Sequence, residues 1–452
     1  MVERLLTEVI DIVIAVINLL GVRKTTSRIN YENKMKEIVI VGGGFAGLNL
    51  AKRLSKSKEY LITLVDQNNY HFFPPLLYQV ATAFIETSNI SYPFRKMFQG
   101  KRVKFFMGKI LKVIPGEKKI LTDSGEVSYD ILVLAMGTET NFFGNEEIAK
   151  NSLPMKSIDE ALSMRNHILL QLEKATRADE LSDKIRFSNV VIAGGGPTGV
   201  ELAGMLAEMS KNVMSKDYPD HELNLGKVYL VDGLNTLLAP MSAKSQKEAF
   251  NVLSELKVEI LLNTLVKGYD GKTVSLSDGS EISAATLIWA SGVIARTVLG
   301  IPKDSIGKGR RILVDGYNQV IGLQDVFAIG DQCLQMSDSS FPNGHPQLAQ
   351  VAIQQGNLLA DNLNRKSKAG QMKTFHYNDK GSMAIIAKFK AVVDLPKGFF
   401  KGFLAWLIWL FIHILPIAGF RNKTKLFFNW LWSFITNDPT LRLIIRPSEN
   451  EK

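Results

Sequence analysis

Two clusters of glycines have the residue type and the spacing that bind the pyrophosphate of a dinucleotide. They read Gly42-x-Gly44-x-x-Gly47 and Gly194-x-Gly196-x-x-Gly199. In such a cluster the first glycine permits a tight turn, the second lets the backbone approach the pyrophosphate, and the third allows close packing of helix on strand. The pyrophosphate then meets the unpaired N–H groups of the helix N-terminus. Two clusters in one chain predict two bound dinucleotides, and the alternative is a pair of purely structural glycine turns.

An acidic residue ends the strand that follows each glycine cluster. These residues are Asp66 and Asp232. A carboxylate at this position accepts hydrogen bonds from the hydroxyl groups of an adenosine ribose. Asp232 also repels the 2′-phosphate of NADPH, and residues 233–238 contain no arginine that would bind this phosphate. The second cluster is therefore expected to prefer NADH.

The glycine clusters lie in repeated strand–turn–helix patterns. Residues 37–41 and 189–193 are apolar, β-branched runs that lead into the glycines, and helical spacing of apolar residues follows each cluster. Acid-ended strands are expected at 61–65 and 228–231. The repeat predicts an α/β fold with two Rossmann-like domains, each a parallel sheet flanked by helices.

A late strand assigns the two dinucleotides. Residues 325–331 form an apolar run that ends in Gly330-Asp331, which resembles the second flavin motif of two-dinucleotide flavoproteins; a plain helix cap is the alternative interpretation of Asp331. The second unit is then inserted in the first. We expect an FAD-binding domain from residues 35–150 and 301–370, and an NADH-binding domain from residues 151–300. FAD belongs at Gly42–Gly47 and NADH at Gly194–Gly199.

Buried runs that end in glycine, Tyr129–Gly137 and Thr286–Gly292, complete the two candidate sites. The residues expected to bind FAD are Gly42, Gly44, Phe45, Ala46, Gly47, Asp66, Ala135, Gly137, Gly330, Asp331 and Ala349. The residues expected to bind NADH are Gly194, Gly196, Pro197, Thr198, Gly199, Asp232 and Gly292.

The composition narrows the class of protein. A chain of 452 residues with 46% hydrophobic and 22% charged residues is globular and long enough for two or three domains. The single cysteine, Cys333, excludes a disulfide framework, a thiolate zinc site and electron transfer through a cysteine pair within one chain. The histidines are scattered and predict no metal site, and His71 is expected to be structural and not a general base.

Five segments together resemble the type II NADH:quinone oxidoreductases, which are single-subunit, non-proton-pumping respiratory dehydrogenases. The resemblance runs from about Lys36 to Arg446. Its segments are His71–Ala81, Gly194–Ala203, Ala349–Gln355, Tyr377–Met383 and Gly419–Asn422. It implies electron transfer from NADH through FAD to a membrane quinone. A soluble NADH–flavin reductase with another acceptor and a redox-sensing NADH-binding protein are the alternatives.

The segment Ala349–Gln355 combines small residues with repeated amides at the start of a helix. Alanines permit the close approach of a flat ring, and glutamine amides bond to carbonyl oxygens. The resemblance implies that Ala349, Gln350 and Gln354 line the flavin and the quinone head group. A solvated, glutamine-rich helix face is the alternative.

Glu201 follows the second glycine cluster by two residues. One interpretation is a favourable interaction with the helix dipole. The other is a proton relay, because reduction of a quinone to a quinol consumes protons. The resemblance places Glu201 near the catalytic centre, and Lys423 in the C-terminal tail is its candidate partner.

The C-terminal tail, residues 371–452, is predicted to anchor the protein to a membrane. From Lys397 to Arg446 there are seven basic residues and one acidic residue, Asp438, around an uncharged run at residues 402–420. Basic charge with Trp, Phe and Leu suits an anionic bilayer better than nucleic acid. Pro416 and Gly419 interrupt the run, which favours two helices lying in the interface over one that spans it.

The second tail helix is expected to be amphipathic. Its polar stripe comprises Asn422, Lys425, Asn429, Ser433 and Thr436. Trp406, Trp409, Trp430 and Trp432 are expected at headgroup depth, on the cytoplasmic face of the cell membrane. Part of the apolar surface could equally form a homodimer contact.

The N-terminal extension, residues 1–34, has two interpretations. It is a short amphipathic helix, or Met35 is the functional start, because Met35 opens directly into the first nucleotide-binding strand.

Overall fold

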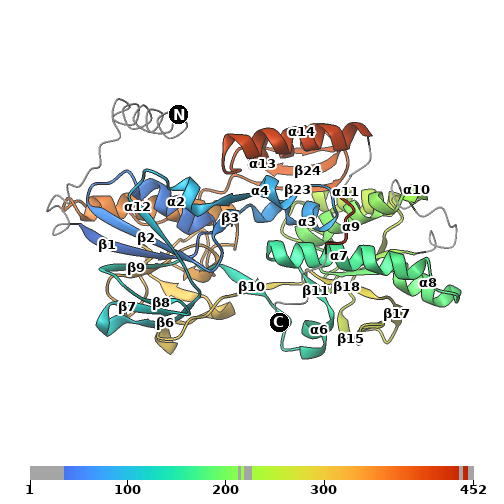
Figure 1. Cartoon of the computed structure of the whole chain (residues 1–452), viewed down its shortest axis with the longest axis horizontal. Helices are drawn as coiled ribbons and strands as arrows, with labels where there is room; N and C mark the ends of the chain where they lie inside the picture. Colours follow the sequence, from blue (N-terminus) through green and yellow to red (C-terminus); the bar gives the residue numbers. More distant parts are fainter. Residues whose placement is uncertain (1–34, 212–214, 218–225, 437–440, 446–452) are drawn as a thin grey trace, which may run out of the picture.

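The computed structural model describes residues 35–211, 215–217, 226–436 and 441–445. The two interpretations of residues 1–34 therefore concern a segment outside the described residues. Two parallel five-stranded sheets lie side by side along the molecule, and a smaller C-terminal unit covers one face of the second (Figure 1).

The first sheet has the strand order β21-β9-β1-β2-β5, with all neighbours parallel. Its strands are β1 (Lys36–Val41), β2 (Tyr60–Asp66), β5 (Val103–Met107), β9 (Ile131–Leu134) and β21 (Val326–Ala328). Helices α2 (Phe45–Leu54) and α12 (Ala349–Lys366) pack together on one face, over Ile38 and Ile40 of β1. The alternate residues Val39 and Val41 join a separate core on the other face, as the two-residue period of a strand requires. That second face is covered by β6 (Ile110–Ile114), β7 (Lys119–Thr122) and β8 (Gly125–Ser128).

The second sheet has the order β11-β18-β12-β13-β14 and is also parallel. Its strands are β11 (Leu153–Pro154), β12 (Val190–Ala193), β13 (Val228–Val231), β14 (Glu259–Leu261) and β18 (Thr286–Trp289). The main helices are α7 (Ile158–Ala175), which begins at a Ser157–Glu160 capping box, α8 (Leu181–Ser188), α9 (Pro197–Met209) and α11 (Ala243–Glu255). A three-stranded sheet covers its opposite face, made of β15 (Val266–Tyr269), β16 (Thr273–Leu276) and β17 (Glu281–Ser283).

The second sheet is inserted in the sequence of the first. All five of its strands fall between β9 and β21, and β21 returns to the edge of the first sheet beside β9. The chain crosses between the sheets through β10 (Thr138–Thr140) and β19 (Val293–Ala295), which pair antiparallel. The α/β dinucleotide-binding fold expected from the glycine clusters is therefore present.

The C-terminal region contains a sheet that the sequence interpretation missed. Strands β23 (Ser382–Ala387), β24 (Lys390–Leu395) and β25 (Gly398–Lys401) form an antiparallel meander, and β23 packs directly on α9. The short apolar runs of β23 and β24 are buried in the same core as α9, so these residues belong to the folded body. Only α13 (Gly402–Ile414) and α14 (Phe420–Thr436) match the expected tail helices, and they lie over this sheet (Figure 1).

The burial of the tail helices differs from the expectation in two ways. Trp406, Trp409 and Trp430 are buried against the sheet and α3 (Leu77–Ala81), and of the four tryptophans expected at headgroup depth only Trp432 is largely exposed, at 63%. Two residues of the expected polar stripe of α14 are also turned inward, because Asn422 donates a hydrogen bond to the Ser91 carbonyl and Ser433 is buried, whereas Lys425 is exposed. No helix of the described residues is both long enough and apolar enough to cross a bilayer.

Candidate functional site

Both glycine clusters adopt the geometry that a bound pyrophosphate needs. Gly42 and Gly194 have φ values of +104° and +112°, in the left-handed region that favours glycine. Gly44 and Gly196 precede the first residues of α2 and α9, and a Cβ built on either would meet no atom within 4 Å. No side chain caps the first turn of either helix. The first residues are Phe45 and Ala46 in α2, and Pro197 and Thr198 in α9. The unpaired N–H groups of each helix N-terminus therefore lie beside open space.

The third glycine of each cluster is required by packing. A side chain on Gly47 or Gly199 would collide with the carbonyl oxygen of Gly42 or Gly194, respectively. The helix therefore approaches its own strand as closely as the pattern predicts.

The two strand-ending acids bind the backbone of the glycine turns. Asp66 accepts hydrogen bonds from Gly43 N at 2.6 Å and from Asn68 N at 2.8 Å. Asp232 accepts from Gly195 N and, at 2.7 Å, from Leu234 N. Burial raises the pKa of Asp66, and the two backbone hydrogen bonds oppose this shift. Each acid thus fixes the turn of its glycine cluster.

Gly330-Asp331 lies next to the first glycine cluster. Gly330 has φ +74°, and a Cβ built on it would lie 3.1 Å from Ala46 Cβ on α2 and 3.5 Å from Ala352 Cβ on α12. Asp331 is next to this junction, where burial raises its pKa while the charges of Lys156 and Arg311 oppose the shift. The structure therefore brings Gly330 and Asp331 together with the N-termini of α2 and α12, where Ala349 is the first residue.

Two glutamines that the sequence interpretation missed hold this junction. Gln355 Oε1 accepts a hydrogen bond from Gly330 N at 2.7 Å, and Gln332 Oε1 accepts from Met136 N at 3.0 Å. Met136 lies between Ala135 and Gly137, so Gln332 joins the Tyr129–Gly137 run to the Gly330 turn. The Gln355 amide is also 3.3 Å from Cys333 Sγ. The sequence could have indicated Gln332, because it directly follows Gly330-Asp331.

The remaining glycine of the second unit lies where the chain crosses between the sheets. Gly292 follows β18, and its carbonyl oxygen accepts a hydrogen bond from Asn141 N at 3.1 Å. A Cβ on Gly292 would approach the Phe143 ring to 3.1 Å.

Glu201 lies in the first turns of α9 and faces the C-terminal sheet. Its carboxyl accepts a hydrogen bond from the backbone N–H of Ile385 in β23, and burial raises its pKa well above the usual range of a glutamate. Lys423 does not reach it, because the Lys423 ammonium donates to the Leu415 carbonyl at 2.6 Å. Among the described residues Glu201 forms no ion pair, so the expected Glu201–Lys423 pair is absent from this structure. The partner of Glu201 is the backbone of Ile385 in β23, and not Lys423.

Gln350 and Gln354 both bind the backbone of residues 378–381. Gln350 donates to the Gly381 carbonyl at 2.8 Å and accepts from Lys380 N at 3.2 Å. Gln354 donates to the Asn378 carbonyl at 2.9 Å and accepts from Asn378 N at 3.1 Å. In this structure the two amides connect α12 to the segment that leads into β23.

His71 has the structural role expected of it. Its Nδ1 lies 2.9 Å from the Gly43 carbonyl, and burial lowers the pKa of the imidazole to about 4. The imidazole is therefore neutral at neutral pH and donates its Nδ1 hydrogen to the glycine turn.

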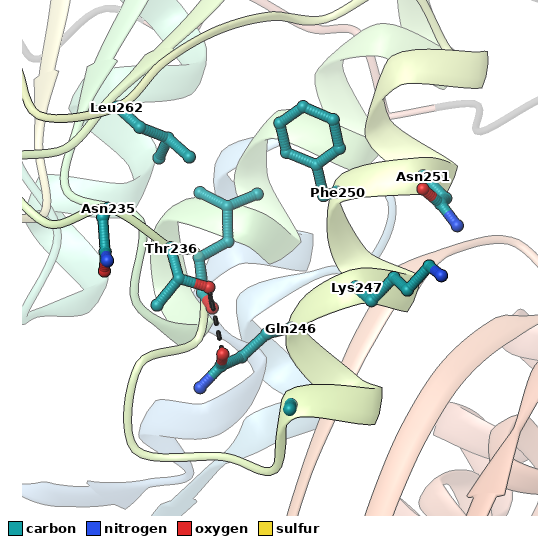
Figure 2. A pocket seen from close by; sticks show the side chains of 9 residues that line it. Asn235, Thr236, Gln246, Lys247, Phe250, Asn251 and Leu262 are labelled. Atoms are coloured by element: carbon teal, nitrogen blue, oxygen red, sulfur yellow. Dashed lines mark hydrogen bonds between the residues drawn. The ribbon is translucent and has the colours of Figure 1, made fainter.

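A pocket of about 460 Å³ lies next to the second acid. Residues 235–237 form one wall, and Gln246, Lys247 and Phe250 of α11 form the other (Figure 2). Its first lining residue, Asn235, follows Asp232 by three positions in the chain.

The chain is similar to known oxidoreductases. The family model described as pyridine nucleotide-disulphide oxidoreductase matches residues 36–356. The type II NADH:quinone oxidoreductase Ndh of Mycobacterium tuberculosis is 33% identical over 415 residues, which is 88% of each chain.

The chain belongs to the type II NADH:quinone oxidoreductases.

Other proteins are similar to this chain over most of its length. The mitochondrial internal alternative NAD(P)H-ubiquinone oxidoreductase A1 of Arabidopsis thaliana is 29% identical and covers 89% of this chain and 85% of its own. Among solved structures, NDH2 from Plasmodium falciparum in complex with NADH has a TM-score of 0.82 at 22% identity and covers 91% of this chain and all of its own. The sulfide:quinone oxidoreductase of Aquifex aeolicus has a TM-score of 0.65 at 18% identity, which shows a shared fold alone.

Proposed function

We propose that the protein oxidises NADH and passes the two electrons through FAD to a membrane quinone, without pumping protons. The observation that carries the proposal is the meeting of Gly330-Asp331 with the first glycine cluster, because it separates a flavin site from a nicotinamide site in a chain of this family. FAD, when bound, accepts a hydride from NADH and delivers two electrons to the quinone. NADH, one proton and the quinone become NAD⁺ and the quinol.

The protein residues bind and align the two dinucleotides. The N-terminus of α2, Asp66 and Asp331 would hold FAD at the first sheet, and the N-terminus of α9 with Asp232 would hold NADH at the second. Open space at Gly44 and Gly196 fits a pyrophosphate at each turn. The two sites are joined through the paired strands β10 and β19.

The quinone head group is proposed to bind beside Ala349, Gln350 and Gln354. These residues begin α12, whose N-terminus lies at the Gly330 junction. The glutamines would act there through the 378–381 backbone that they hold. Glu201 would supply a proton, because burial raises the pKa of its carboxyl and so favours the protonated form. Lys423 would contribute positive charge on the surface of α14 and would not pair with Glu201.

The exposed face of α13 and α14 is proposed to dock on the cytoplasmic surface of the cell membrane. Its outward residues are apolar and include Phe411 at 65%, Phe420 at 85% and Phe428 at 58% exposure. Leu404, Leu407, Leu415, Phe427, Leu431 and Trp432 continue the same face. Exposed Lys401, Arg421 and Lys425 accompany it and complement anionic lipid headgroups.

The central experiment measures quinone-dependent NADH oxidation by the detergent-extracted full chain, with stopped-flow recording of the flavin. Rapid flavin reduction by NADH and rapid reoxidation by a benzoquinone or naphthoquinone are expected. Reoxidation no faster than with oxygen would overturn the assigned acceptor.

Membrane docking is tested with the double variant Phe411→Glu/Phe428→Glu. It is expected to lose cosedimentation with anionic vesicles while it keeps NADH oxidation by a small soluble acceptor. Retained binding would contradict the bilayer assignment, and conversion from dimer to monomer without a change in vesicle binding would assign the face to a second copy of the chain.

A further inference from the structure

Phe143 holds an aromatic ring in solvent beside the second dinucleotide site. Its side chain is 67% exposed, whereas the ring of the preceding residue, Phe142, stacks on Trp289 with the ring centroids 6.2 Å apart. Among the described residues, Phe142 packs against the core of the second sheet and Phe143 is not part of that core. Packing between the described residues therefore does not explain why position 143 carries a large apolar ring.

The backbone of Phe143 is also strained. Its φ is +52°, in the left-handed region that glycine and asparagine adopt readily and in which the Cβ of a phenylalanine is crowded. The turn is held by Asn141, because Phe143 N donates to Asn141 Oδ1 at 2.9 Å and Trp289 Nε1 donates to the Asn141 carbonyl at 2.8 Å. Strain of this kind persists where the surrounding structure enforces it, and such positions cluster at ligand sites.

The strained turn lies against Gly292. Asn141 N donates to the Gly292 carbonyl at 3.1 Å, and a Cβ built on Gly292 would lie 3.1 Å from Phe143 Cζ. The Phe143 ring also meets the Trp289 ring edge to face, with the centroids 6.5 Å apart. Since Trp289 is the last residue of β18, the Phe143 ring lies at the carboxyl end of that strand, where β10 crosses between the two sheets (Figure 1).

The strand order indicates which half of NADH would meet this ring. A dinucleotide binds across the carboxyl ends of parallel strands where the strand order reverses, which in the second sheet is between β12 and β18. Asp232 follows β13, on the other side of β12, and is proposed to bind the adenosine ribose. The nicotinamide half then extends toward β18. The loop after β18 is close to the second glycine turn, because Ala290 N donates to the Ala193 carbonyl at 2.8 Å.

We propose that the Phe143 ring contacts the nicotinamide ring of NADH and positions it at the passage between the two sheets. The inference rests on the proposed function. Two flat rings attract each other in offset-stacked or edge-to-face arrangements, with their centroids about 4.5–7 Å apart. The bound nicotinamide would also remove the exposed Phe143 ring from water. Asn141 and Trp289 fix the turn, so the position of the ring is set before NADH binds.

The test compares Phe143→Asn and Phe143→Tyr with wild type. Asparagine accepts left-handed backbone, so Phe143→Asn removes the ring without adding strain. Tyr317→Asn is the matched control, because it removes a ring that is 37% exposed on a loop before β21. Calorimetry measures the Kd of NAD⁺ and that of ADP-ribose, which lacks the nicotinamide. Stopped-flow absorbance measures flavin reduction by NADH and reoxidation by quinone.

Phe143→Asn is expected to raise the Kd of NAD⁺, and the NADH concentration that gives half-maximal flavin reduction, by about ten-fold. ADP-ribose binding and reoxidation by quinone should be unchanged, because neither involves the nicotinamide ring. Phe143→Tyr and Tyr317→Asn should keep the wild-type values, since the first retains the ring face and the second lies elsewhere. Thermal unfolding of Phe143→Asn should occur at or above the wild-type temperature, because the strained residue is replaced by one that accepts this backbone.

The possible failures are distinguishable. A folded Phe143→Asn protein that binds NAD⁺ and NADH as wild type does would overturn the inference alone. Equal weakening of NAD⁺ and ADP-ribose would also overturn it, because the change would then act on the glycine turn and not on the nicotinamide. A changed oligomeric state with unaltered NADH binding would assign the ring to a contact between copies of the chain instead. Absence of flavin reduction by NADH in wild type would overturn the proposed function itself.

Discussion

Gly204 determines how closely the C-terminal sheet approaches helix α9, and replacing it with alanine tests that contact. A Cβ built on Gly204 would lie 1.6 Å from the Ile386 carbonyl oxygen, whereas ordinary contact begins at 3.4 Å. The position of the Cβ is fixed by the backbone of α9, and the Ile386 oxygen belongs to the backbone of β23. The sheet must therefore move away by nearly 2 Å, a shift that follows from these two distances.

The displacement breaks the hydrogen bonds on either side of the contact. Glu208 Oε1 accepts from Lys388 N at 2.8 Å, and Glu201 accepts from Ile385 N. Losing two such bonds costs about 1–3 kcal/mol each. Alanine by itself would stabilise the helix by about 1 kcal/mol relative to glycine. We therefore expect Gly204→Ala to destabilise the docked sheet by about 1–5 kcal/mol net.

Hydrogen exchange measures this local free energy directly. The amides of Ile385 and Lys388 should exchange at least about 5-fold faster in Gly204→Ala, since 1.4 kcal/mol corresponds to ten-fold. Gly116→Ala is the control, because its Cβ would enter open space at an ordinary φ. A Gly204→Ala protein with equal or slower exchange at these amides would refute the close contact between α9 and β23.

Three further predictions concern the dinucleotide sites and the buried titratable groups. Asp232→Ala is expected to lower kcat/KM for NADH by about 10- to 100-fold. The ratio of kcat/KM for NADH to that for NADPH should also fall, as measured by steady-state kinetics with both cofactors. His71 has a pKa of about 4 against 6.5 when unfolded, so the stability that it contributes is complete above pH 6.5 and declines as the pH falls toward 4. This loss reaches about 3 kcal/mol, and urea unfolding of His71→Asn should lack that part of the pH dependence. Burial raises the pKa of Cys333 to about 11, so alkylation at pH 8 should be about 100-fold slower in the folded than in the unfolded protein, and equal rates would contradict its burial.

The sequence was informative where chemistry depends on local geometry. Gly42 and Gly194 require left-handed backbone, and Asp66 and Asp232 act on turns that are near them in three dimensions because parallel strands share an edge. The pairing of β21 with the first sheet was also predicted. The run that ends in Gly330-Asp331 resembles a flavin motif, and the flavin was assigned to the first sheet. These features allowed the α/β fold to be predicted before any contact was known.

The partners of Glu201 could not be predicted in the same way. Ile385 lies 184 positions farther along the chain and contributes only a backbone N–H, which has no residue type to recognise. The runs of β23 and β24 are apolar, and only the structure shows that they are buried in the core with α9. The tryptophans were misplaced for the same reason, since composition does not distinguish the side of a helix that faces protein from the side that faces outward.

The insertion of one sheet in the other imposes an order of assembly. All five strands of the second sheet are present once the chain extends to Trp289, so this unit is able to fold while the rest is being synthesised. The first sheet must wait for β21, and until Ala328 emerges β9 remains an unpaired edge whose residues Ile131–Leu134 are entirely apolar. That strand presents an apolar edge in the nascent protein, and substitution of one of its residues by a charged residue should reduce the yield of folded protein.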